Sequence, residues 1–277
     1  MKVPIDKFFG IIQAIKNPVI PKRQVFVIST ILLTVILLLT QVVSQDFRYA
    51  FVIFLAICTY IISAYALRED LNGVEWLTLL VLPALYSAAV ALFYFLLPVR
   101  WLTRIPVAIV YALGLYALLL TENIFNVAAN RTIALLRAAH SVGFLITFIT
   151  YLLLSQIIFA FRLGPTFNAL GIGLLSFFLI FQSLWVMELT EKASRRVLVI
   201  TAVLTLVLSE FSFMVSLWPA QPLMRSLFIS SLFYSLTGMT QQYVVERMYK
   251  KTVIEFLIVT VVIFVIFLAT SSWRSAV

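Results

Sequence analysis

The chain has 277 residues, of which 63% are hydrophobic and only 11% are charged. An average soluble domain is about 45–50% apolar and about 25% charged, and the mean hydropathy of this chain is +1.11. These values exclude a soluble globular domain, a disordered chain and a small disulfide scaffold. They predict an all-α protein, a polytopic bundle of transmembrane helices.

The net charge is +9, from 20 Lys and Arg against 11 Asp and Glu. In a soluble protein this excess would suggest a nucleic-acid partner, but here the basic residues lie between apolar runs, where they set the orientation of the spans. We therefore expect no nucleic-acid partner. The chain has one cysteine, Cys58, and one histidine, His140, so it has no Cys-rich or multi-histidine metal motif. We predict neither a metal site nor a cofactor.

Apolar runs recur along the chain from residue 24 onward, separated by short links. Spanning a bilayer needs roughly 20 apolar residues. The runs of about that length occupy residues 24–43, 47–67, 76–97, 105–121, 138–161, 166–187, 197–217, 226–245 and 252–272. None of the links is long enough to hold a soluble domain. We therefore predict about nine spans in one bundle that covers residues 24–277.

The positions of Lys and Arg predict the orientation of this bundle, because basic residues favour the cytoplasmic side. With a cytoplasmic N-terminus, 14 basic residues lie inside and 6 outside, and all seven lysines lie inside. We therefore expect the N-terminus in the cytoplasm and the C-terminus outside.

Residues 1–23 precede the first run and form a basic N-terminal arm. Ile5, Phe8, Ile12 and Ile15 fall on one face of a helix, whereas the lysines lie away from that face. This pattern predicts a short amphipathic helix in the cytoplasmic interface of the bilayer. The alternative is a flexible arm that only sets the orientation.

The link between the fourth and fifth runs has the most unusual composition. Its polar side chains are candidates for a binding site at the cytoplasmic mouth of the bundle: Glu122, Asn126, Asn130, Arg131, Arg137 and His140. The first three share one helical face, because they are spaced by four residues. Arginine and amide groups suit an anionic solute or lipid headgroup. The alternative is a solvated link whose charges cap the neighbouring spans.

Glu210 is the second candidate, because it is the one charged residue inside the seventh run. An ionisable group inside a span is costly, so we expect Glu210 to point into the bundle or into a water-filled cavity. One interpretation is a proton or cation site. The other is a neutral carboxyl, or a carboxylate paired with Arg225.

The stretch from Thr121 to Phe144 reads TENIFNVAANRTIALLRAAHSVGF. It resembles an uncharacterised family of bacterial multi-pass membrane proteins. The resemblance implies a location in the bacterial cytoplasmic membrane, but it assigns no role to any residue because the family has no assigned function.

Three classes of function remain open. The first is binding or transport of a small anionic solute or lipid, which the mouth residues and Glu210 favour. The second is a non-catalytic scaffold or subunit whose polar groups only fix the helix packing. The third is a membrane-embedded enzyme acting on a lipid or peptide. We favour it least, because the chain has no Walker loop, no G-x-S-x-G motif and no paired-aspartate motif. The bilayer is the one partner that the composition itself predicts.

Overall fold

The computed structural model describes residues 21–40, 47–68, 74–96, 101–128, 135–190, 193–246 and 248–271. Within these ranges the chain is all α. The helices are α2 (Lys22–Thr40), α3 (Arg48–Leu67), α4 (Glu75–Tyr94), α5 (Trp101–Ala128), α6 (Leu136–Ala160), α7 (Pro165–Glu188), α8 (Arg195–Ser216), α9 (Pro222–Val244) and α10 (Lys250–Thr270). The predicted N-terminal interfacial helix falls on residues 1–20, which lie outside the described residues.

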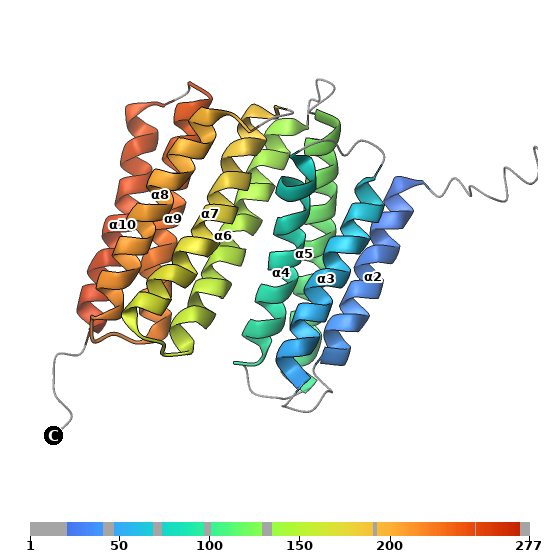
Figure 1. Ribbon diagram of the computed structural model, residues 1–277, viewed down its shortest axis with the longest axis horizontal. Coiled ribbons are helices and arrows are strands. Elements are labelled where there is room, and N and C mark those ends of the chain that lie inside the picture. The colour runs from blue at the N-terminus through green and yellow to red at the C-terminus, as the bar shows by residue number, and fades with distance from the viewer. Residues whose placement is uncertain are drawn as a thin grey trace, which may run out of the picture.

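The helices lie side by side, and successive helices run in opposite directions (Figure 1). The bundle extends from α2 and α3 at one side to α10 at the other. One end of it holds the first residues of α2 and α10 and therefore carries Lys22, Lys250 and Lys251. We refer to this end as the Lys-rich end.

The predicted helical membrane bundle is confirmed in the described part of the chain. Eight of its helices are long and apolar enough to cross a membrane. The exception is α9, which has 23 residues but carries many serines, threonines and glutamines. Most of these polar side chains are buried, among them Ser226, Ser230, Ser235 and Gln241. Small and polar residues between helices allow close approach and interhelical hydrogen bonds in a membrane, so α9 suits the interior of the bundle.

Helix α5 is longer than the predicted span, which covered residues 105–121. The structure continues this helix through Ala128, so Glu122 and Asn126 belong to the helix and not to a solvated link. Both side chains are buried. The helix continues because these polar residues face other helices and not water.

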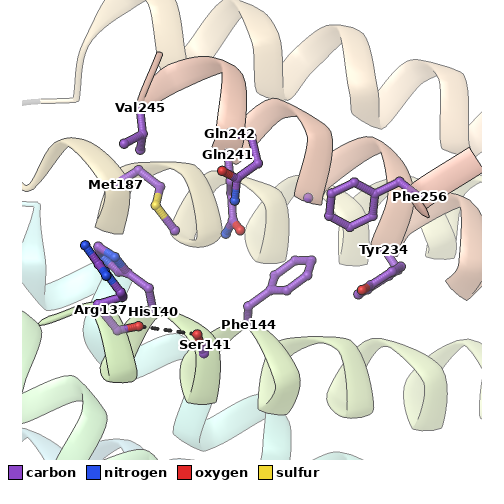
Figure 2. Close-up of a pocket in the computed structure, with 11 residues that line it drawn as sticks. Arg137, His140, Ser141, Phe144, Met187, Tyr234, Gln241, Gln242, Val245 and Phe256 are labelled. Carbon is purple, nitrogen blue, oxygen red and sulfur yellow. Dashed lines mark hydrogen bonds between the residues drawn. The ribbon is translucent and has the colours of Figure 1, made fainter. Parts of the chain in front are cut away.

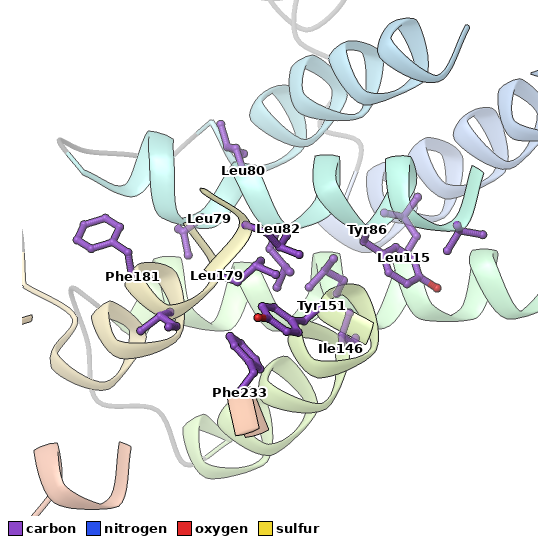
Figure 3. Close-up of a cluster of buried hydrophobic side chains, with 14 of the residues drawn as sticks. Leu79, Leu80, Leu82, Tyr86, Leu115, Ile146, Tyr151, Leu179, Phe181 and Phe233 are labelled. Carbon is purple, nitrogen blue, oxygen red and sulfur yellow. The ribbon is translucent and has the colours of Figure 1, made fainter. Parts of the chain in front are cut away.

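The central layer of the bundle is formed by α6 and α7, with α4 and α9 packed on them. Figure 3 shows their interlocked apolar side chains. The ring of Tyr151 stacks on Phe233 of α9 with centroids 4.0 Å apart, and its hydroxyl lies 2.9 Å from Oγ of Ser176 on α7. One aromatic residue of α6 therefore ties together two neighbouring helices, and this core holds the site described next.

Candidate binding site

A pocket of about 450 Å³ opens near the Lys-rich end, between α6, α9 and the start of α10. We call it the Arg137 pocket. It is lined by Arg137, His140, Ser141, Phe144, Met187, Tyr234, Gly238, Gln241, Gln242, Val245 and Phe256. Figure 2 shows Arg137 and His140 at one end of it, the two glutamines in the middle and the three aromatic rings at the other end. The pocket is therefore polar at one end and aromatic at the other.

The polar end is built by the first turns of α6. Arg137 is exposed, and its backbone oxygen accepts a hydrogen bond from Ser141 Oγ at 3.3 Å. His140, three residues further on, stacks on Phe125 with ring centroids 5.3 Å apart. Its Nε2 atom donates to the backbone oxygen of Val186 at 2.9 Å. The imidazole is thus fixed in place, whereas the guanidinium of Arg137 stays accessible.

Two amides of α9 form the middle of the pocket. Gln241 is buried, and its Nε2 atom donates to Ser183 Oγ at 2.7 Å and to the Ser183 backbone oxygen at 3.0 Å. Gln242 is half-buried on the same wall. Because its nitrogen is engaged by α7, Gln241 ties the wall of the pocket to the central layer.

The aromatic end joins three helices. Tyr234 of α9 stacks on Phe144 of α6 with centroids 5.5 Å apart, and Phe256 of α10 tilts against the same tyrosine at 5.1 Å. Tyr234 precedes Gln241 on α9, and by helix rise it lies about 10 Å further from the Lys-rich end, deeper inside the bundle. This wall therefore offers an apolar surface at the depth of lipid chains.

The predicted mouth cluster is divided in the structure. Arg137 and His140 line the Arg137 pocket, but Glu122 and Asn126 do not. These two are 0% and 1% exposed. Glu122 accepts a hydrogen bond from Gln182, and Asn126 donates one to the backbone oxygen of Leu67. The expectation that Asn126 shares one polar space with Arg137 and His140 is therefore wrong. Asn130 and Arg131, the other two candidates of this cluster, lie outside the described residues.

Glu210 is also placed differently from the prediction. It is exposed on α8, so the expectation that it points into the bundle is wrong. The buried face of α8 carries Val197, Thr201, Leu208 and Ser212, and Glu210 projects from the opposite side. Glu210 is a candidate because it is the single acidic residue in an apolar run, but the helical phase of the buried small and apolar residues of α8 places its side chain on the outer face.

Several residues of this region were missed by reasoning from the sequence. They include Gln182, an amide within an otherwise apolar stretch, and Gln241, an amide within the eighth predicted span. They also include Tyr234, which has no distinguishing sequence signal. Because a buried amide in a span needs a partner, the first two were detectable from the sequence by the same rule that selected Glu210.

The fold and the lengths of the helices define a multi-pass helical membrane protein. The chain belongs to a family of proteins of unknown function, DUF5656, whose model matches residues 50–270. This match confirms the resemblance to an uncharacterised family that the stretch from Thr121 to Phe144 indicated. No curated protein and no solved structure matches the chain.

Proposed function

We propose that the protein binds an anionic lipid in the Arg137 pocket, with the headgroup at Arg137 and an acyl chain along the aromatic wall. The observation that carries this proposal is that one pocket joins an exposed guanidinium to Phe144, Tyr234 and Phe256. Basic pockets between transmembrane helices are typical sites for phosphate-bearing lipid headgroups. A guanidinium binds a phosphate through two parallel hydrogen bonds.

A lipid fits this pocket better than a small anionic solute does. A solute would use the polar end alone and leave the aromatic wall, three of the eleven lining residues, without a function. An amphiphile uses both ends, since its apolar part contacts the rings while its charge meets Arg137. Transport of the bound molecule is a further hypothesis that this pocket does not require.

The orientation of the bundle belongs to the same proposal. The Lys-rich end faces the cytoplasm in the orientation that the Lys and Arg distribution favours. The Arg137 pocket then opens toward the cytoplasmic leaflet, which is rich in anionic lipids. The bacterial cytoplasmic membrane is the location we propose.

The experiment is a comparison of lipid retention by native mass spectrometry on the purified full chain. The probes are dioleoyl phosphatidylglycerol, dioleoyl phosphatidylcholine and inorganic phosphate. We expect preferential retention of phosphatidylglycerol. Loss of a charge-assisted contact in Arg137→Ala should weaken its binding about tenfold or more, and Arg137→Lys should weaken it less.

Arg195→Ala is the matched control, because Arg195 is an exposed arginine at the same end that does not line the pocket. It should bind phosphatidylglycerol like the unchanged protein. Equal retention of both lipids, or equal loss in the Arg137 and Arg195 variants, would refute the proposal. Phosphate binding without lipid preference would instead support a solute site.

A scaffold function is the second candidate, and interhelical hydrogen bonds favour it. Ser155 bonds to Ser230, and Ser226 donates to Gln156, so polar groups of α9 are used to hold α6. A scaffold predicts that the Arg137 variants change neither lipid retention nor stability.

A further inference from the structure

Away from the Arg137 pocket, three buried side chains present polar oxygens that have no hydrogen-bond partner. They are Glu122 and Asn126 of α5 and Gln182 of α7, with exposed fractions of 0%, 1% and 3%. The free atoms are Oε2 of the carboxyl group, Oδ1 of the asparagine and Oε1 of the glutamine. Buried polar atoms nearly always have a partner in native proteins, so these three oxygens need a hydrogen-bond donor or a cation beside them.

Glu122 links the three residues. Glu122 and Asn126 are four residues apart and therefore lie one turn apart on the same face of α5. Gln182 joins them from α7, because its Nε2 atom donates to Oε1 of Glu122 at 3.1 Å.

The amide nitrogens of this group are already engaged. Asn126 Nδ2 donates to the backbone oxygen of Leu67 at 3.0 Å, which leaves Oδ1, an acceptor with no hydrogen to donate, as the free atom of this amide. The same reasoning applies to Gln182, whose nitrogen faces the carboxyl group. The group therefore has more acceptors than donors, and a bound cation would satisfy the surplus oxygens.

The charge balance supports the same conclusion. Gln182 is the one hydrogen-bond partner of Glu122 among the residues that the structure describes. An ionised carboxylate that is buried without a cation is strongly destabilised. One positive charge beside it would make the group neutral and at the same time satisfy the free oxygens.

We propose that Glu122, Asn126 and Gln182 bind one monovalent alkali cation, with Na⁺ as the probe ion. A single carboxylate balances a single charge, which makes a divalent ion such as Ca²⁺ or Mg²⁺ a poorer match. Those ions also need more oxygen ligands or retain several waters. The absence of sulfur and nitrogen ligands disfavours zinc, copper and similar metals. The sequence alone predicts no metal site and makes Glu122 a candidate for binding an anion.

This site is independent of the proposed lipid pocket, and the two can be tested separately. The full chain is purified in detergent in choline chloride at constant ionic strength and pH, and NaCl then replaces the choline salt. Tryptophan fluorescence reports the unfolding temperature. We expect the unfolding temperature to rise by about 2–3 °C at a Na⁺ concentration about ten times the dissociation constant, and to keep rising with the logarithm of the concentration above it.

Glu122→Gln should abolish this rise, because it removes the charge and keeps the shape. Glu210→Gln is the matched control, since it removes an exposed carboxylate in another span, and it should keep the full rise. Equilibrium binding of radioactive Na⁺ to the unchanged chain gives a second measurement that does not depend on the folding of a variant, and we expect one ion per chain.

The proposal is overturned if neither Na⁺ nor K⁺ raises the unfolding temperature and no Na⁺ is bound. It is also overturned if Glu122→Gln keeps the rise, because the ion then binds elsewhere. Stability that responds to pH but not to any alkali cation would assign the free carboxyl oxygen to a proton and would overturn the cation site as well.

Discussion

The Nε2 atom of Gln182 in α7 donates a 3.1 Å hydrogen bond to Oε1 of Glu122 in α5, and both side chains are buried. The bond joins residues that are 60 positions apart in the sequence. It joins α5 to α7 through two buried polar side chains. The stability of the fold should therefore depend on keeping these residues matched.

The first prediction concerns this pair. Gln182→Met removes the donor of Glu122 and should lower the free energy of unfolding by about 1–3 kcal/mol, because a buried acceptor loses its partner. The double variant Glu122→Met/Gln182→Met should regain much of that loss, since replacing both partners by apolar groups of similar shape is nearly neutral. Chemical unfolding in choline chloride measures the free energy of unfolding of the single and the double variant. Gln221→Met, at an exposed amide before α9, is the control, and a double variant less stable than the single one would contradict the prediction.

The second prediction concerns the close approach of α9 and α10. A Cβ atom at Gly238 would lie 2.5 Å from Cε1 and 2.6 Å from Cζ of Phe256. Gly238→Ala should therefore displace the Phe256 ring and lower the free energy of unfolding by about 1–3 kcal/mol, as overpacking does.

Gly171→Ala is the control for this substitution. The nearest atoms to a Cβ there belong to Ile158 at 3.5 Å, an ordinary contact, and alanine is the better helix former. Its unfolding temperature should be unchanged or higher. Equal loss of stability in both glycine variants would show that α9 and α10 do not pack as described.

The third prediction concerns Glu210, which projects from the outer face of α8. By helix rise it lies about 9 Å from the last residue of that helix, Ser216. A carboxylate at that depth is costly when it faces lipid, so Glu210→Leu should raise the unfolding temperature in lipid nanodiscs. A lower temperature, or loss of an oligomer on size-exclusion chromatography, would show that Glu210 has a polar partner in the assembled protein.

The fourth prediction concerns the orientation. Reporter fusions after Arg196 should report a cytoplasmic position, and fusions after Arg225 an external one, because the basic residues concentrate at the Lys-rich end. The opposite readings would place the Arg137 pocket at the external leaflet.

Much of the architecture was predictable because hydropathy reports spans directly. The end of α5 was not, because Glu122 and Asn126 resemble a solvated link when they are considered without their partners. Only the position of Leu67 and Gln182 in space shows that each has a hydrogen-bond partner inside the bundle.

The candidate site was predictable in part. The sequence selected Arg137 and His140, and the pocket contains both. It did not select Tyr234 or Phe256, because aromatic residues are common in lipid-facing positions and only the packing of α9 and α10 places these two opposite Arg137. The rarity of charge in its run does not predict where Glu210 points, because the helical phase of the buried residues of α8 decides the direction of each side chain.

Photocrosslinking tests the central claim, that the Arg137 pocket holds an anionic lipid, most directly. Phosphatidylglycerol and phosphatidylcholine analogues, each with a photoreactive group in an acyl chain, are added to the purified chain, and the labelled peptides are identified by mass spectrometry. We predict that the phosphatidylglycerol label concentrates on peptides with Phe144, Tyr234 and Phe256 and is lost in Arg137→Ala. Equal labelling by both analogues, spread over the outer faces of α2, α8 and α10, would contradict the account.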